Sequence, residues 1–141
     1  MAIEPVHIPG HDPKWNMPYT AGLKVTGGSL LFVSGVTAAP VYHSHPHVTA
    51  EFDDLPDDPA TQAELAMDNL AAVLDAGGTS ISGLVQLMRF IVDIERNQDD
   101  INRVIGARLG NHRPTTTTVE VVRLATDPRL VLELQAIAAV D

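Results

Sequence analysis

The stretch NHRPTTTTVEVV, residues 111–122, is the starting point for predicting the fold of the chain. Four threonines run directly into a segment in which apolar and polar residues alternate. β-branched side chains favour strands, and this alternation is typical of a strand with one buried face. We therefore predict a strand over residues 115–122. Thr115 and Thr117 should lie on one face of it, and Thr116 and Thr118 on the other.

The remaining elements can be placed outward from this strand by periodicity and by helix-end signals. Residues 1–20 and 36–58 lack periodicity and are expected to be irregular. The first helix should begin at Asp58-Pro59, an N-cap acid followed by proline, and the second should be capped by Asn97. The expected elements are strands at 23–25 and 30–34, a helix from 59 to Gly77-Gly78, a strand at 84–94, a helix from Asn97 to Gly110, and strands at 115–122 and 130–140.

This order predicts an α+β fold with two helices on one face of a mixed sheet. Apolar residues occur at both strand parities in 84–94 and in 130–140, so both faces of the sheet require burial. A single layer of helices covers only one face. The sequence therefore predicts a homo-oligomer that packs its open sheet faces together.

Composition limits the kinds of molecule that the chain is expected to bind. With 141 residues, of which 45% are apolar, the chain fits one domain spanning residues 1–141. A net charge of −9 argues against nucleic acid or an anionic membrane as the main partner. The chain has no cysteine, and its N-terminal residues show no signal-peptide pattern. We expect a cytoplasmic protein that acts on a small molecule.

Several segments, in their order and spacing, resemble the RidA/YjgF family of enamine/imine deaminases. The resemblance implies a chorismate mutase-like sandwich with a mixed six-stranded sheet, assembled as a homotrimer with ligand clefts between subunits. It also implies a hydrolase that acts on C–N bonds without a cofactor. The segments that carry the resemblance are Pro18-Tyr19, GLKV (22–25), LLFVSG (30–35), MDNLAAVLDAGG (67–78), VEVVRL (119–124) and LELQAIAAV (132–140).

The chain departs from the family pattern in the threonine strand. Deaminases of this family usually carry there an arginine that binds the substrate carboxylate, and alignment on VEV places Thr116 at that position. Thr118 falls where some relatives have cysteine. Arg113 lies on the opposite parity and is a poor substitute. The resemblance therefore predicts weak activity on the usual 2-imino acids, with the hydroxyls of Thr116 and Thr118 available to contact a different substrate.

Other residues match the family site. Tyr19 matches a tyrosine that lines the cleft, and Ser34 and Gly35 match a segment that contacts the ligand. Glu133 matches an acid thought to position or activate water, a role that suits a partly buried carboxylate. The resemblance thus implies that Glu133 and Ser34 are catalytic and that Tyr19 and Gly35 bind substrate. The structural alternatives are a half-buried tyrosine and an ordinary hydroxyl at a strand end.

The loop VYHSHPHVTAEFDD, residues 41–54, is rich in histidine. Alternating residues of an extended segment point to the same side, so His43, His45 and His47 could converge on a metal. Pro46 interrupts this regularity, however, and the resembled family needs no metal. We therefore expect no metal site. The loop is either solvated or borders the cleft, in which case His43 and His45 would bind substrate.

Two classes of function follow from this pattern. The first is a hydrolytic deaminase whose substrate differs from that of the arginine-bearing members, such as the ring-cleavage product 2-aminomuconate. The alternative is a trimer of the same fold that binds small molecules or acts as a chaperone without catalysis. The ribonuclease activity attributed to some relatives is disfavoured by the acidic charge.

Overall fold

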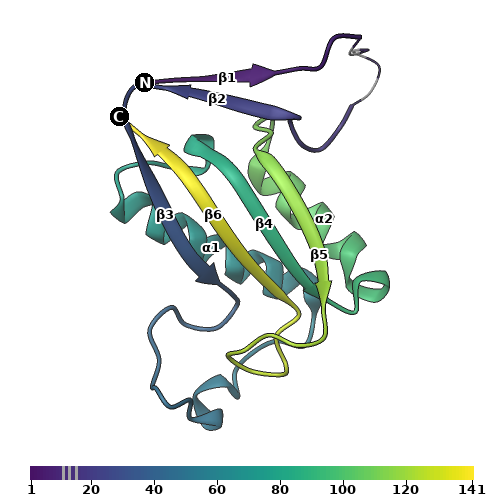
Figure 1. Cartoon of the computed structure of the whole chain (residues 1–141). Helices are drawn as coiled ribbons and strands as arrows, with labels where there is room; N and C mark the ends of the chain where they lie inside the picture. The colour runs from purple at the N-terminus through teal and green to yellow at the C-terminus, as the bar shows by residue number, and fades with distance from the viewer. Residues whose placement is uncertain (11, 13, 15) are drawn as a thin grey trace.

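The computed structural model of the chain describes residues 1–10, 12, 14 and 16–141 (Figure 1). Two longer helices and six strands are joined by loops that contain two short 3-10 helices. The elements are β1 (Ala2–Val6), β2 (Gly22–Thr26), β3 (Ser29–Val36), η1 (Thr49–Phe52), α1 (Pro59–Ala76), η2 (Ile81–Gly83), β4 (Leu84–Val92), α2 (Ile94–Leu109), β5 (Thr115–Val121) and β6 (Leu132–Val140).

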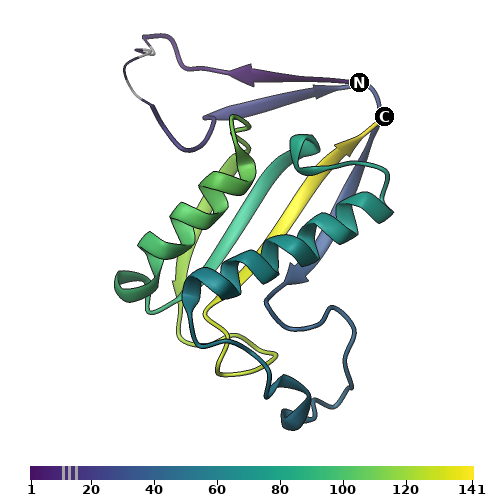
Figure 2. The same cartoon turned by 180° about the vertical axis from the view of Figure 1, so that it is seen from behind.

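The six strands form two sheets. The main sheet has the order β3-β6-β4-β5, in which β4 and β5 are parallel and the other pairs are antiparallel. β1 and β2 form an antiparallel ribbon beyond one end of this sheet. Both long helices cover the same face of the main sheet, as Figure 2 shows. The expected six strands and two-helix layer are therefore present, with the strands divided four and two.

The main core lies between α1, α2 and the sheet. α1 begins where Asp58 accepts a hydrogen bond from the Thr61 backbone N–H at 3.0 Å, and proline occupies its first turn, as predicted. Its buried side chains recur at helical spacing and pack against apolar residues of β6 and β4. The fully buried residues here include Ala63, Ala66, Met67, Leu70, Leu74, Leu84, Leu87, Ile91, Leu132 and Leu134.

The other face of the main sheet carries no helix and exposes several large apolar side chains. On β3, Phe32 is 71% exposed and Leu30 is 50% exposed, and Val119 of β5 is also exposed. Cross-strand pairing joins Phe32 to Ile137 and Leu30 to Ala139 of β6. A single chain thus leaves large apolar side chains of the open face in water, as the parity of the strands predicted.

Several elements differ from prediction in their presence or their ends. The expected irregular arm contains β1, because Pro5 is tolerated in a two-stranded ribbon that has only edge strands; residues 11, 13 and 15 of that arm lie outside the described residues. Asn97 does not cap α2. Its buried amide donates to Val92 O at 2.7 Å, and the N-cap is Asp93, with a left-handed φ of 49°. The strands predicted at 84–94, 115–122 and 130–140 are shorter by one or two residues at one end.

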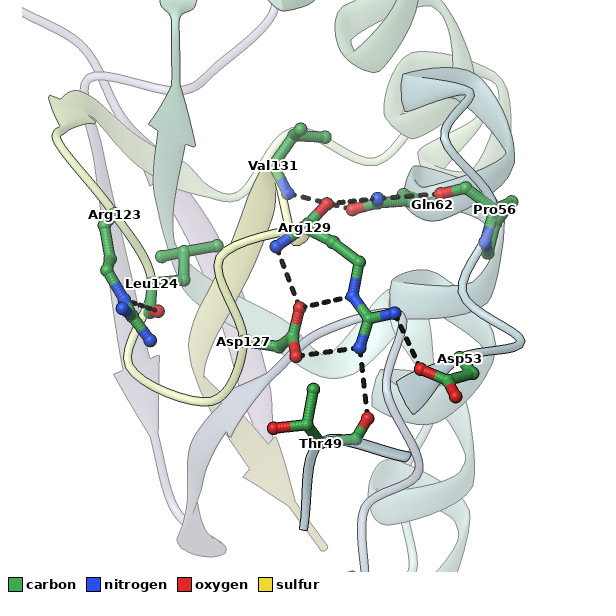
Figure 3. A network of polar contacts seen from close by, with 9 residues as sticks. All are labelled: Thr49, Asp53, Pro56, Gln62, Arg123, Leu124, Asp127, Arg129 and Val131. Atoms are coloured by element: carbon green, nitrogen blue, oxygen red, sulfur yellow. Dashed lines mark hydrogen bonds and ion pairs between the residues drawn. The ribbon is translucent and has the colours of Figure 1, made fainter. Parts of the chain in front are cut away.

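A second, smaller core fixes the loops at the lower end of the sheet in Figure 1. It is built around Phe52 and two leucines of the β5–β6 connection, Leu124 and Leu130. Arg129 joins the loops in a polar network (Figure 3): it donates to both carboxylate oxygens of Asp127, to Asp53 and to Thr49 O. The 37–58 loop is thereby anchored to the β5–β6 connection.

Candidate functional site

A cavity of about 380 Å³ lies between the edge strand β5, its neighbour β4 and the helix α2. This volume is in the range of small-molecule binding sites. Three of the predicted site residues, Tyr19, Thr116 and Thr118, line it. The other lining residues are Pro18, Leu87, Arg89, Gln98, Asn102, Ile105, Gly106 and Leu109.

The register of β4 and β5 explains why two threonines face the cavity. In this parallel pair Thr116 lies opposite Leu87, and Thr118 lies opposite Arg89. Leu87 is buried in the helix-covered core, so its partner Thr116 points to the same side of the sheet. The predicted division of the four threonines between two faces places Thr116 and Thr118 at the cavity.

Arg89 is the charged residue of the cavity, and its environment is unusual. The residue is only 9% exposed, although it belongs to a strand whose neighbouring inward residues, Leu87 and Ile91, are apolar. One terminal nitrogen donates to Asn102 Oδ1, while the Nε–H is buried and has no hydrogen-bond partner. Arg89 forms none of the ion pairs found among the described residues. Burial lowers its pKa from the ordinary arginine value.

This arrangement prepares the cavity for an anion. An unpaired buried donor on a charged group costs free energy that a hydrogen-bonded anion would recover. A carboxylate matches the planar guanidinium and could accept from it in a bidentate manner. The hydroxyl of Thr118 adds a neutral hydrogen-bonding group at the same cavity, and that of Thr116, which donates to Pro114 O at 3.2 Å, can still accept.

The sequence prediction missed Arg89. Residues 84–94 were interpreted as a core strand because of their apolar content, and the arginine within them was assigned no role. One signal was available: Arg89 has the same parity as Leu87 and Ile91, so a charged residue stood at an inward position. Charged residues at such positions are rare unless they are paired or functional.

Glu133 and Gly35 form a second group at the junction of β6 and β3. The β3–β6 register shifts between Val33 and Val36, so Ser34 and Gly35 lie in a bulge. A Cβ placed on Gly35 would lie 2.6 Å from Glu133 Oε1, and only glycine accommodates this approach without a shift. Burial raises the pKa of Glu133, as expected for a carboxyl group that takes up a proton from water.

Within one chain, this second group does not share the cavity. Leu132 and Leu134 belong to the core beneath the helices, so Glu133 between them faces the open side of the sheet. Glu133 lies opposite Phe90, whereas the inward Arg89 lies opposite Leu134. The described residues that line the cavity include neither Ser34 nor Gly35 nor Glu133. The carboxylate and the guanidinium are therefore on opposite faces of the same sheet.

The predicted histidines occupy a third place. The rings of His43 and His45 lie 4.8 Å apart in the loop after β3, and His47 lies beside both. Neither His43 nor His45 is among the described residues that line the cavity. Their predicted contact with substrate stays a prediction. Arg113 donates to Gly110 O and His112 O at the end of α2, in keeping with its exclusion as a substitute clamp.

Comparison with known proteins identifies the family. The family model described as Endoribonuclease L-PSP matches residues 10–140. The chain belongs to this family. It is the RidA/YjgF group that the sequence resembles, and the resemblance is thereby confirmed. No helix of this Rid-family protein, over its described residues, is long and apolar enough to cross a membrane.

Individual relatives resemble this Rid-family protein in sequence, in fold or in both. The 2-iminobutanoate/2-iminopropanoate deaminase of Escherichia coli K12 is 27% identical over 124 residues, which are 86% of each chain. TdcF of the same strain is 31% identical over 86% of this chain and 85% of its own. The crystal structure of E. coli TdcF with bound serine has a TM-score of 0.66 at 30% identity, with 89% and 90% covered. YyfB from Yersinia pestis, at 21% identity, shows the fold alone, with a TM-score of 0.78 and coverage of 99% and 100%.

Proposed function

We propose that this Rid-family protein is a hydrolytic deaminase for an enamine or imine that carries a carboxylate, and that Arg89 binds this carboxylate. The deaminase name of a relative that shares most of the chain supports the reaction class. The observation that carries the proposal is the buried guanidinium of Arg89, whose Nε–H has no partner and which lines the same cavity as Thr116 and Thr118.

Arg89 can replace the arginine that the family pattern places at position 116. The two positions lie on adjacent strands and point into the same cavity, since Leu87 pairs with Thr116 and Arg89 with Thr118. Because Arg89 pairs with Thr118 and not with Thr116, the arginine Cα lies about 5 Å across the sheet and about 6.6 Å along it from position 116, roughly 8 Å in all. The length and freedom of the side chain are sufficient to compensate for this distance. If Arg89 binds the substrate carboxylate, the presence of Thr116 in place of arginine no longer predicts weak activity on 2-imino acids by itself.

The reaction requires water, a base and an acid. An enamine first takes a proton at carbon and becomes an imine. The water oxygen then bonds to the imine carbon, the C–N bond breaks, and the products are a carbonyl compound and ammonia. We assign Glu133 to accept the proton of water and to return it to the leaving nitrogen, because burial raises its pKa and so makes it a stronger proton acceptor than an ordinary glutamate. Ser34 would hydrogen-bond the reacting groups beside it.

The separation of Glu133 from the cavity supports a composite site between chains. Within one chain these groups lie on opposite faces of the sheet, so a second copy must supply one of them. The exposed apolar face that contains Phe32 and Leu30 provides a surface for such packing. We propose a homotrimer in which the Arg89 cavity of one subunit adjoins Glu133 of the next. Closed cyclic symmetry would repeat this site three times.

The size of the cavity bears on the substrate. A volume of about 380 Å³ exceeds the needs of a four-carbon imino acid, so a larger substrate such as 2-aminomuconate is compatible with it. Tyr19 would stack against such an extended substrate, and the hydroxyls of Thr116 and Thr118 would form hydrogen bonds with its polar atoms. A cytoplasmic location and the lack of nucleic-acid and membrane partners stay predictions.

The proposal is tested by ammonia release. Imines are generated in the assay from a panel of amino acids by an amino-acid oxidase, and 2-aminomuconate is tested separately. We expect the protein to accelerate ammonia release from at least one carboxylate-bearing imine, and Glu133→Gln to abolish this acceleration. Ligand binding without acceleration by the wild-type protein for every member of the panel would instead favour the non-catalytic binding trimer.

A further inference from the structure

A cluster of three imidazoles lies outside the Arg89 cavity. His43, His45 and His47 come from the loop after β3, and their potential ligand atoms all lie within 4.8 Å of one another. The ring centroids are 4.8 Å apart for His43 and His45, 5.2 Å for His43 and His47, and 4.8 Å for His45 and His47. The alternate spacing in the sequence therefore does bring the three rings together, despite Pro46.

We propose that these three histidines bind one divalent transition-metal ion, of which zinc is the reference case. Imidazole nitrogen suits Zn²⁺, Cu²⁺, Fe²⁺ and Ni²⁺, whereas Ca²⁺ and Mg²⁺ prefer oxygen ligands. Three nitrogens bound to one tetrahedral ion at about 2.0–2.1 Å lie about 3.3 Å apart. Ring rotations and a closure of up to about 1.5 Å would bring the observed cluster to that geometry.

The hydrogen bond of His43 fits a metal ligand. Its Nδ1 lies 2.8 Å from Pro40 O. A carbonyl oxygen only accepts, so Nδ1 carries the proton, and in the neutral ring Nε2 then keeps a free lone pair. Metal-binding histidines commonly donate their second nitrogen to a carbonyl or carboxylate in this way, which orients the ring and fixes its tautomer.

Glu51 supplies negative charge beside the cluster. Its carboxylate accepts hydrogen bonds from the Ser44 N–H, at 3.0 Å, and from the Ser44 hydroxyl. Ser44 lies between the first two histidines in the sequence, so Glu51 is tied to the segment that carries the ligands. An ionised carboxylate here would offset part of the charge of a bound dication.

The loop is held in place independently of any ion. Phe52 is buried, and the rings of His43 and His47 pack edge-on against it, with centroids 5.3 and 6.0 Å away. Arg129 holds the adjacent backbone through Thr49 O and the carboxylate of Asp53 (Figure 3). The ligands thus project from a supported loop, which reduces the ordering cost of binding.

Three protein ligands leave one position of a tetrahedral ion open. This coordination is typical of sites where the ion also binds water or an exogenous ligand, whereas structural zinc sites are usually closed by four protein ligands. The structure therefore assigns to this loop an open His₃ site. The inference does not depend on the deaminase activity, because metal binding is measured without substrate.

The test is metal titration of the full chain, prepared without a polyhistidine tag and stripped with a chelator. Zn²⁺ is added in competition with a chromophoric chelator, and Co²⁺ is added separately to read the coordination from its visible spectrum. We expect one Zn²⁺ per chain and an intense, tetrahedral-type Co²⁺ absorption. His45→Ala should weaken Zn²⁺ binding by more than about 100-fold, since the loss of an outer-shell partner alone costs 10–100-fold.

Two further variants make the result specific. His7→Ala removes an exposed imidazole outside the cluster and should leave the Zn²⁺ dissociation constant within about twofold of wild type. Glu51→Gln should weaken binding by about 10-fold. His45 is exposed, so its variant should keep the melting temperature of the metal-free protein. Equal Zn²⁺ affinity of wild type and His45→Ala, or equal loss in His7→Ala, would overturn the site. Unchanged affinity in Glu51→Gln would overturn the role given to Glu51.

Discussion

Replacement of Arg89 by methionine separates its role in binding from its role in folding. Methionine fills much of the same volume between Leu87 and Ile91 but removes the charge and the unpaired Nε–H. A charge-assisted contact in a buried site is worth about 1.5–3 kcal/mol, which corresponds to a loss of about 10- to 150-fold in kcat/KM. Because the substrate carboxylate is equally charged before and during the reaction, most of this loss should appear in KM.

The stability of the same variant is the internal control. Replacement of a buried charge by an apolar side chain of similar volume is often neutral or stabilising. Asn102, which loses its partner, is exposed and can be hydrated. Arg89→Met should therefore melt at or above the temperature of the wild type. Arg103→Met changes an exposed arginine of α2 that pairs with Asp100, and it should alter kcat/KM by less than about twofold.

A second substitution tests whether a guanidinium at another position restores the lost activity. Adding Thr116→Arg to Arg89→Met returns a guanidinium to the cavity from the neighbouring strand, at the position that the family pattern favours. Steady-state kinetics on the best imine of the panel should then show recovery of most of the lost kcat/KM. If Arg89→Met folds normally and retains wild-type kcat/KM, the assignment of Arg89 to the substrate carboxylate is wrong.

Further changes test the catalytic acid, the loop network and the open face. Burial raises the pKa of Glu133, so ionisation of this group lowers the stability of the folded protein once the pH exceeds the ordinary glutamate pKa of about 4.3. Glu133→Gln should abolish turnover. In thermal melting it should be at least as stable as wild type at pH 7, with a smaller difference at pH 4. Gln62→Leu leaves the Val131 N–H and the carbonyls of Pro56 and Arg129 without their partner, and chemical denaturation should show a loss of about 3 kcal/mol or more. Phe32→Glu places a charge on the open sheet face, and sedimentation should show the expected trimer dissociating, whereas an unchanged mass would exclude this face from the interface.

The parts of the fold that depend on local pattern could be predicted from the sequence. The start of α1 followed from Asp58-Pro59, and the orientation of the four threonines followed from strand alternation. The start of α2 could not be predicted, because Asn97 has the chemistry of a cap but is buried and donates to Val92 O, while Asp93 adopts a left-handed conformation. β1 was missed because its pairing with β2 depends on a contact between distant segments.

The candidate site was predictable residue by residue but not as an arrangement. Alternation within one strand shows which residues share a face with Thr116 or with Glu133. It does not show whether Thr116 and Glu133 lie on the same face of the sheet, because that depends on the register between strands. The register shows that these residues point to opposite sides of the sheet. The parity of Arg89 indicates an inward side chain, but the sequence does not show that this side chain lines a cavity and contacts Asn102 of α2.

Mixed oligomers test the central claim most directly. Arg89→Met and Glu133→Gln chains are unfolded together, refolded at equal amounts, and assayed below KM for ammonia release. If the cavity of one chain works with Glu133 of the next, random mixing restores about one quarter of the composite sites, although each variant alone is nearly inactive. The account therefore predicts activity near one quarter of the wild-type level. Activity no higher than the average of the two separate variants, from mixtures shown by mass spectrometry to contain both chains, would contradict a site shared between subunits.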